Sequence, residues 1–208
     1  ESFPYAVILL ENEANALAFG EFCHAEQPDL KSLVYVNVAT SINSGIILNG
    51  QIHRGANGRA GDIGQMHVDV LNTEGEVEDI ISLESLASAT SIAMEAQTAA
   101  SSNIETSLVF HENGILTARD VGIAAAKGDA VAREIIERSG HLLGATLANI
   151  VNFLDPDLVL IGGPVVEVSP VFLAAIRRNI LERSTSQSTQ HLRIEIAPLG
   201  PEAAVLGA

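Results

Sequence analysis

Residues 149–163 read Asn-Ile-Val-Asn-Phe-Leu-Asp-Pro-Asp-Leu-Val-Leu-Ile-Gly-Gly, and this stretch decides the fold. From Ala130 to Leu154, apolar residues recur at spacings of three, four and seven, which predicts one long helix with a buried stripe. Asp155-Pro156 ends that helix, and Leu158 to Gly163 is typical of a buried strand that runs into a glycine turn. A long helix followed directly by a buried strand indicates an α/β fold.

The chain on either side continues this alternation of strands and helices. Downstream, the sequence predicts a helix over Pro170 to Leu181, a strand over Leu192 to Ala197 and a helix start at Glu202. Upstream, two strands are expected at Leu33 to Val38 and Gly45 to Gly50, separated by the polar bend Thr40 to Ser44. The pair Asn49-Gly50 favours a tight hairpin into Gln51-Ile52-His53. A mixed sheet flanked by helices follows from this order.

The remaining segments carry weaker signals. Tyr5 to Leu10 has the length of a buried strand, and Asn12 can cap a helix after it. Residues 54–65 hold four glycines without apolar periodicity, which predicts a loop. We expect the acidic stretch Glu74 to Asp79 to be a solvated turn, and residues from about Ile80 to Ala100 to form an alanine-rich helix.

Composition excludes several classes of protein. The 208 residues include 11 Lys+Arg against 26 Asp+Glu, a formal charge of −15 that repels nucleic-acid backbones and anionic lipid. No apolar run approaches the roughly 18 residues of a membrane span. The single cysteine, Cys23, forms no internal disulfide and favours an intracellular, cytoplasmic setting. We therefore expect a soluble globular chain with no membrane partner.

Four polar residues stand where strands give way to loops or helices: Asn12, Glu13, Asp62 and Glu84. Ligands of α/β folds meet the sheet at such positions, and carboxylates and amides hold sugar hydroxyls through hydrogen bonds. Taken alone, these residues are better explained as a helix cap at Asn12 and acids on the surface. The pair Gly162-Gly163 can approach a phosphate or an adenosine, although turn geometry explains it as well.

Five segments, in chain order, resemble a known family. They are Leu10–Ala16, Ser44–Gly50, Arg54–Met66, Gly128–Arg133 and Asn149–Gly163. They resemble the ROK family of bacterial sugar kinases and sugar-responsive repressors, over residues 4 to 208. The resemblance implies an actin-like ATPase, ribonuclease-H-like fold, of which this chain is mainly the C-terminal lobe. The N-terminal lobe and any DNA-binding module of a repressor would precede residue 1.

The chain departs from the kinases of this family at two catalytic motifs. The kinases carry Glu-Asn-Asp, whose Asp is the general base, whereas this chain has Glu11-Asn12-Glu13. One added methylene displaces the carboxylate by more than about 1 Å, and a misplacement of that size can cost on the order of 100-fold in rate. The second phosphate loop resembles Gly-Thr-Gly-Ile-Gly-Gly-Gly in the kinases but reads Ala39-Thr-Ser-Ile-Asn-Ser-Gly45 here. Thr40, Gly45, Gly162 and Gly163 remain as remnants of the nucleotide loops.

The zinc motif of the family is also replaced. Its His ligand corresponds to Gln65, and its three cysteines, which precede Leu-Glu in the family, are missing before Leu83-Glu84. We expect no metal at this place and no bound cofactor. The resemblance nevertheless implies a sugar pocket formed by Asn12, Glu13, Asp62, Gln65 and Glu84.

These observations favour a regulator that senses a sugar without catalysing a reaction. Residues 1–208 would be the effector-binding and dimerisation region of a ROK transcriptional repressor. Its expected partners are a small sugar or sugar phosphate, a second copy of itself, and operator DNA through a module outside this chain. The alternatives are an active ROK kinase that phosphorylates a hexose or N-acetylhexosamine with ATP, and a protein that neither phosphorylates nor senses.

Overall fold

A five-stranded mixed sheet forms the centre of the computed structural model, which describes residues 10–25, 27–71, 74, 76–102, 104–110 and 114–208. The strands are β1 (Leu33–Val38), β2 (Ile42–Leu48), β3 (Gln51–Ile52), β6 (Leu158–Gly162) and β7 (Arg193–Ile196). Their order is β3-β2-β1-β6-β7. β1 is antiparallel to β2 and parallel to β6, and β6 is parallel to β7. The carboxyl ends of β1, β6 and β7 therefore lie at one edge of the sheet.

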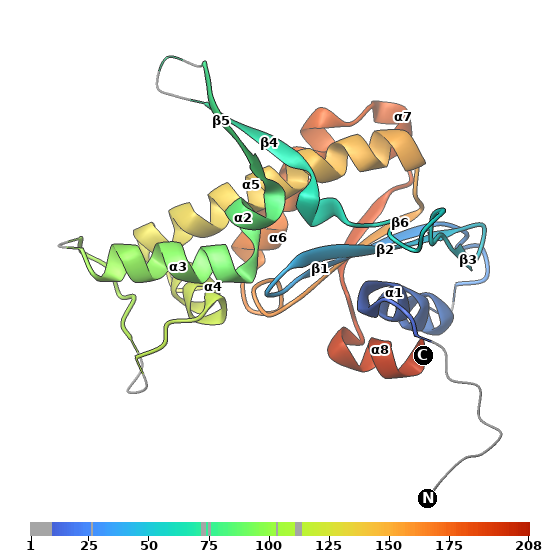
Figure 1. The fold of residues 1–208 in the computed structure, drawn as a ribbon, viewed down its shortest axis with the longest axis horizontal. Helices are drawn as coiled ribbons and strands as arrows, with labels where there is room; N and C mark the ends of the chain where they lie inside the picture. The colour runs from blue at the N-terminus through green and yellow to red at the C-terminus, as the bar shows by residue number, and fades with distance from the viewer. Residues whose placement is uncertain (1–9, 26, 72–73, 75, 103, 111–113) are drawn as a thin grey trace, which may run out of the picture.

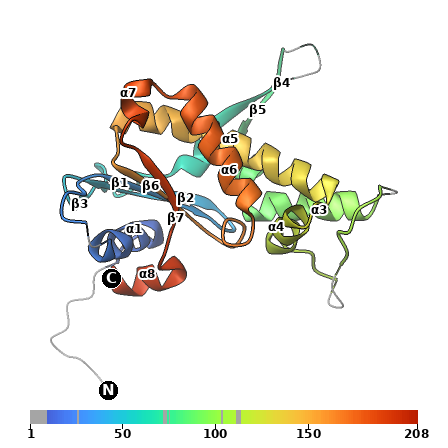
Figure 2. The ribbon, with the colours of Figure 1, turned by 180° about the vertical axis from the view of Figure 1, so that it is seen from behind.

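Alternate residues of β1 face two separate cores. Val34, Val36 and Val38 are buried against the long helix α5 (Ala130–Leu154) and α6 (Pro170–Arg183). Leu33 and Tyr35 pack on the other face, against α1 (Glu13–His24) and α8 (Ala203–Leu206). Figures 1 and 2 show α1 and α8 on one side of the sheet and α5 and α6 on the other.

Glycines let α1 approach its neighbours at backbone distance. A Cβ on Gly20 would lie 2.0 Å from the Ala203 carbonyl oxygen, and one on Gly207 would lie 2.0 Å from that of Ala16. On the sheet side, a Cβ on Gly45 of β2 would lie 2.1 Å from the Ala14 carbonyl oxygen. These contacts fix the first turn of α1 directly above β2.

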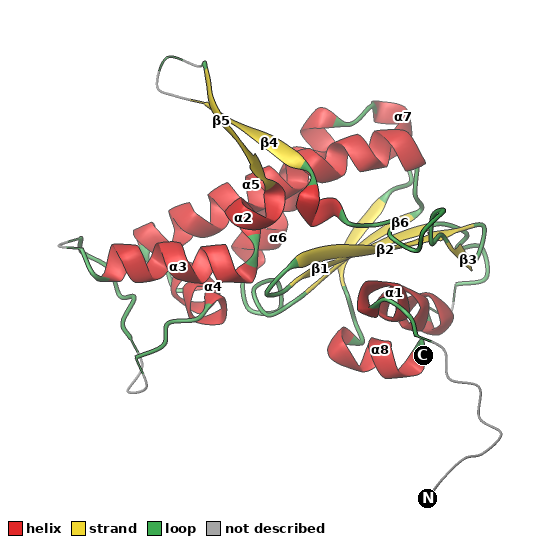
Figure 3. Cartoon of the chain, viewed as in Figure 1, coloured by secondary structure: helices red, strands yellow, loops and turns green. Residues whose placement is uncertain are grey.

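A second, two-stranded sheet projects from the body, as Figure 3 shows. It pairs β4 (His67–Leu71) with β5 (Val77–Ser82). Two short helices come after it, α2 (Leu83–Ala87) and α3 (Ala89–Ala100). The other elements are α4 (Ala118–Ala126), α7 (Ser186–Thr189) and the 3-10 turns η1 (Ile63–Gln65) and η2 (Gly200–Glu202).

The elements predicted around residues 149–163 are confirmed. The helix predicted over residues 130–154 is α5 with the same bounds, and Asp155 ends it in the left-handed region at φ 48°. The strand predicted after it is β6, and the helix and strand predicted downstream are α6 and β7. The Asn49-Gly50 hairpin is present with both residues at positive φ, and Asn12 caps α1.

The prediction of one helix from Ile80 to Ala100 is wrong. Residues 80–82 belong to β5, and Ser88 divides the rest of the segment into α2 and α3. Ser82 caps α2, and Ser88 has an extended ψ of 162°, which breaks the helix, while its hydroxyl caps α3. The acidic stretch is corrected too, because Val77 to Asp79 pair with β4 instead of forming a turn.

Three further segments differ from the sequence prediction or lie beyond it. The polar bend expected at Thr40 to Ser44 is shorter, because β2 begins at Ile42 and pairs with β1 from there. Helix α4 was not predicted from the sequence. The strand expected at Tyr5 to Leu10 lies outside the described residues, apart from Leu10, which belongs to no element.

Candidate functional site

The start of α1 is fixed by a small polar network. The side chain of Asn12 accepts a hydrogen bond from the Ala14 N–H at 2.8 Å. Glu11 accepts bonds from the Asn12 N–H and the Asn15 side chain, each at 2.9 Å, and from Arg54 Nε at 2.7 Å. Burial raises the pKa of Glu11, but these bonds and the Arg54 charge outweigh it and lower that pKa overall. Arg54 thereby ties the glycine-rich loop to the N-terminus of α1.

The glycine-rich loop covers the open edge of β2. Both the Ser44 N–H and the Ser44 hydroxyl donate to the Gly61 carbonyl, at 2.7 and 2.9 Å. Gly61 has φ 94°, and a Cβ there would lie 1.9 Å from the Ser44 carbonyl oxygen. The loop was predicted from its glycines, and this close approach is the reason for one of them.

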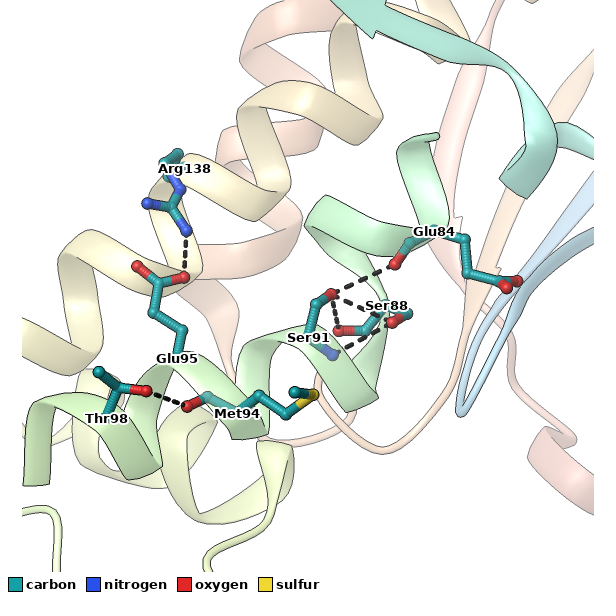
Figure 4. Close-up of polar contacts among 7 residues, drawn as sticks. All are labelled: Glu84, Ser88, Ser91, Met94, Glu95, Thr98 and Arg138. Carbon is teal, nitrogen blue, oxygen red and sulfur yellow. Dashed lines mark hydrogen bonds and ion pairs between the residues drawn. The ribbon is translucent and has the colours of Figure 1, made fainter. Parts of the chain in front are cut away.

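Glu84 is attached to the same edge. Its Oε2 accepts a hydrogen bond from the Ile42 N–H at 3.0 Å, and its carbonyl oxygen accepts one from Ser91 Oγ at 3.3 Å. Figure 4 shows the Glu84 side chain directed away from α3, whereas its carbonyl faces Ser91 and the Ser88 cap. A Cβ on Gly64 would lie 3.1 Å from Glu84 Oε2. Glu84 therefore sits between the sheet edge and η1.

The predicted sugar residues fall into two groups. Asp62, Gln65 and Glu84 surround η1, where Asp62 and Gln65 are exposed and the Asp62 side chain makes no cap bond. Asn12 and Glu13 begin α1. Strand β2 links the groups, because Ile42 contacts Glu84 while Gly45, three residues on, contacts α1.

The four positions predicted as remnants of nucleotide loops each have a local structural role. Gly45 makes room for α1. The Thr40 carbonyl accepts a bond from Thr90 Oγ1 at 3.1 Å. Gly162 makes room for the Tyr35 hydroxyl, since a Cβ there would lie 2.1 Å from it, and Gly163 turns at φ 118° against the Val38 carbonyl. Packing and turn geometry thus account for these positions without a nucleotide.

A cavity of about 370 Å³ opens at the carboxyl ends of β1 and β6, a volume within the range of small-molecule sites. Glu13 is the one predicted sugar residue on its wall. Its lining comprises Glu13, Leu17, Tyr35, Asn37, Ala39, Gly163, Pro164, Glu167, Gly200 and Pro201. Sequence reasoning missed Tyr35, Asn37 and Glu167. Tyr35 and Asn37 are two positions apart in a strand and so share a face, which was the available signal.

Within the described residues, no group of three or more His, Cys, Asp or Glu side chains could hold a metal ion. Among those same residues, no helix combines the length and apolar character that crossing a membrane requires. The site offers carboxylate, amide and phenol groups beside a sheet edge. Such groups bind hydroxylated ligands by accepting and donating hydrogen bonds.

The sheet, the helices on both faces and the cavity at the strand ends define a lobe of the actin-like ATPase fold. The chain belongs to the ROK family, whose family model matches residues 5–208. It is 32% identical over 205 residues to a glucokinase of Halalkalibacterium halodurans, covering 96% of this chain and 62% of that protein.

Relatives that regulate transcription match equally broadly. The chain is 30% identical over 201 residues to a xylose repressor of Caldicellulosiruptor bescii, covering 96% of this chain and 50% of the repressor. A crystal structure of a ROK family transcriptional regulator, a homologue of E. coli Mlc, superimposes with a TM-score of 0.78 at 25% identity, covering 95% of this chain and 50% of that one. The chain thus spans between half and two thirds of the length of these proteins, and its relatives include both repressors and kinases.

Proposed function

We propose that this chain is the sugar-sensing and dimerising part of a ROK transcriptional regulator that does not phosphorylate its ligand. One observation carries the proposal: three backbone amides of residues 39–45, the segment that matches the second phosphate loop of the kinases, already donate within the protein. The Ala39 N–H donates to the Ser41 carbonyl at 3.0 Å. The N–H of Ile42 and that of Ser44 are bonded to Glu84 and Gly61. A phosphate would have to break these bonds.

The charge at this loop supports the same conclusion. The acceptor of the Ile42 N–H is a carboxylate, so a phosphate at that amide would meet a like charge. The N-terminus of α3, another place where an anion could bind, is occupied by loop carbonyls instead. The Ala89 N–H donates to the Ala39 carbonyl at 2.9 Å, and the Thr90 hydroxyl donates to that of Thr40. ATP is therefore a poor ligand for this lobe.

A kinase remains the second candidate function, because the H. halodurans glucokinase is 32% identical to this chain. Glu13 lies on the cavity wall together with Ala39 and Gly163, so a carboxylate is present near the strand ends. The Glu13 side chain is one methylene longer than the Asp side chain of the kinases. Its carboxylate is therefore displaced from the position that a general base needs beside a sugar hydroxyl. In this proposal Asn12, Glu13, Asp62, Gln65 and Glu84 bind the sugar, and none acts as the base.

The partners follow from this role. The effector is a sugar or sugar phosphate, the chain pairs with a second copy of itself, and operator DNA is bound by a module outside this chain. The charge of −15 supports placing DNA contacts elsewhere in the protein. No cofactor takes part.

A calorimetric titration of the protein with D-glucose, D-xylose, N-acetyl-D-glucosamine and ATP–magnesium tests the proposal. We expect one sugar to bind, with ATP binding at least tenfold more weakly than it does to the H. halodurans glucokinase measured alongside. ATP binding equal to that of the glucokinase would contradict the proposal, as would the failure of every sugar to bind.

A further inference from the structure

The glycine-rich loop has an exposed segment between its two anchors. At one end, the Arg54 carbonyl accepts a hydrogen bond from the Ala60 N–H at 3.1 Å. At the other end, Ser44 donates to the Gly61 carbonyl. Residues 55–59 between these anchors are exposed, and within the part of the chain that the structure describes they make no hydrogen bond. Little therefore restrains their backbone and side chains.

An Asn-Gly pair lies in the middle of this segment. Asparagine is a thermolabile residue, because the backbone nitrogen of the next residue can attack its side-chain carbonyl carbon. Glycine is the follower that reacts most readily, since it has no Cβ to obstruct the approach. Asn57 precedes Gly58, which has open space around it at φ 70°. The Gly58 N–H, whose nitrogen is the nucleophile, has no acceptor among the described residues.

A second Asn-Gly pair in the same chain has a different environment. Asn49 and Gly50 form the turn between β2 and β3, and Asn49 is exposed like Asn57. The Gly50 N–H, however, donates to the Lys31 carbonyl at 2.9 Å. Attack on Asn49 requires this bond to break and the turn to open. The two pairs share their residue types and the exposure of the asparagine, and they differ in whether the nucleophile is held.

We propose that Asn57 is a site of spontaneous deamidation in the folded protein, through attack of the Gly58 nitrogen on the Asn57 side chain. A bond forms between Gly58 N and Asn57 Cγ, and the Cγ–Nδ2 bond breaks. The proton lost from Gly58 N converts the leaving amide group to ammonia. Water then opens the succinimide ring. Addition of water at Cγ yields aspartate, and addition at the main-chain carbonyl carbon yields isoaspartate, whose chain runs through Cγ.

Both products change the glycine-rich loop. Either one places a negative charge between Arg54 and Arg59. Isoaspartate also adds one carbon to the main chain between Arg54 and Ala60, whose hydrogen bond closes this segment. The modification therefore alters the loop that Arg54 ties to Glu11 at the start of α1. This chemistry does not depend on whether the protein is a regulator or a kinase.

Peptide mapping of the full chain after incubation at pH 8 tests the proposal. Trypsin releases Asn57 in the peptide Gly55 to Arg59, which contains no other asparagine, whereas Asn49 is in the peptide Ser32 to Arg54. Incubation in water enriched in the heavy oxygen isotope marks the deamidation of that period. Digestion at pH 6 in ordinary water limits later reaction. The pair Asn113-Gly114 is released in a separate peptide, and its asparagine lies outside the described residues.

Two comparisons isolate the effect of the fold. The same incubation in urea gives the rates of the unfolded chain, in which the Gly50 N–H is no longer held by Lys31. Asn57→Gln is the matched variant, because glutamine keeps the amide but would have to close a larger ring. Asn57 makes no hydrogen bond with any described residue, so this variant should fold as the wild type.

We expect Asn57 to deamidate at least about tenfold faster than Asn49 in the folded protein, because Gly50 reacts only while its hydrogen bond is open. In urea the two rates should converge, and Asn57→Gln should leave the peptide of residues 55–59 unmodified. Equal rates in the folded protein would overturn the proposal. A difference of the same size in urea would also overturn it, because neighbouring residues and not the fold would then set the rates. So would an unmodified Asn57 in the folded protein beside a reacting Asn57 in urea.

Discussion

The Oε2 of Glu84 accepts a hydrogen bond from the backbone N–H of Ile42 at 3.0 Å. This single contact joins the first turn of α2 to the free edge of β2. Edge-strand amides need an acceptor, and here a side chain from 42 residues away supplies it. The same contact places a negative charge at the loop where a kinase would bind phosphate. Glu84 therefore has a structural role, and in the proposed function it also opposes nucleotide binding.

Replacing Glu84 by alanine should destabilise the protein. The Ile42 amide loses a charged acceptor at a partly exposed position, which costs about 1.5 kcal/mol, the low end for such bonds. For a chain of this size that lowers the melting temperature by about 3 to 6 °C. Thermal unfolding followed by circular dichroism measures it. Glu78→Ala, an exposed acid on β5, is the control and should melt as the wild type. Equal melting temperatures for both variants would show that the Ile42 bond contributes nothing.

Gly45→Ala should be more disruptive than its size suggests. The added methyl would lie 2.1 Å from the Ala14 carbonyl oxygen and 2.6 Å from the Ala18 Cβ, so α1 must move away from β2. We expect the free energy of unfolding to fall by about 3 kcal/mol, which is the upper part of the range for overpacked cores. Urea unfolding gives the value.

Gly58→Asn is the comparison for Gly45→Ala. Gly58 has open space around it at φ 70°, a conformation that Asn tolerates. The free energy of unfolding of this variant should fall by less than about 1 kcal/mol, as is usual for solvent-exposed substitutions. Equal losses at both positions would mean that α1 does not depend on the close approach at Gly45.

Asp157 makes stability depend on pH. Burial raises its pKa, but bonds from the Ser32 hydroxyl, from the N–H of Lys31 and of Ser32, and the Arg193 charge outweigh it and lower that pKa. A folded-state pKa below the unfolded value of about 3.9 gives stability that is complete at neutral pH. That stability is lost as pH falls through the folded-state pKa.

Asp157→Asn should therefore lower the free energy of unfolding by about 1 kcal/mol at pH 7, as expected for one weakened charged hydrogen bond. The difference in this free energy between the variant and the wild type should shrink below about pH 4. Unfolding in urea at pH 7, 5 and 3 measures it. Asp155→Asn is a close control, because Asp155 is exposed and sits at φ 48°, where Asn is well tolerated. If the free energies of unfolding of Asp157→Asn and the wild type differed by the same amount from pH 7 to pH 3, the role of the Asp157 charge would be contradicted.

Long periodic segments were predictable from the sequence, and short interrupted ones were not. The apolar stripe of α5 could be predicted because burial of one helix face fixes the spacing of its apolar residues. Strand β6 could be predicted because a strand buried on both faces is a short continuous apolar run. The region after Ile80 misled the prediction because its alanines favour a helix. Pairing of β5 with β4 and the caps at Ser82 and Ser88 override that preference.

The candidate site was predictable only in part, for a similar reason. The polar residues near strand ends could be named from the sequence, and Asn12 was correctly expected to cap a helix. The sequence does not show that Glu84 would bond Ile42, because that contact depends on how α2 meets the sheet edge. Nor does it show that the Tyr35 hydroxyl would lie beside Gly162, which requires the register between β1 and β6.

Phosphoryl transfer is the most direct test of the proposed function. The protein is incubated with ATP, magnesium and each of D-glucose, D-xylose and N-acetyl-D-glucosamine, and ADP formation is measured in a coupled assay, with the H. halodurans glucokinase as the positive control. We predict no sugar-dependent ADP formation above background for any sugar, including one that binds in calorimetry. A sugar-dependent turnover of about 1 per second or more, within the ordinary range of enzymes, would contradict the proposal.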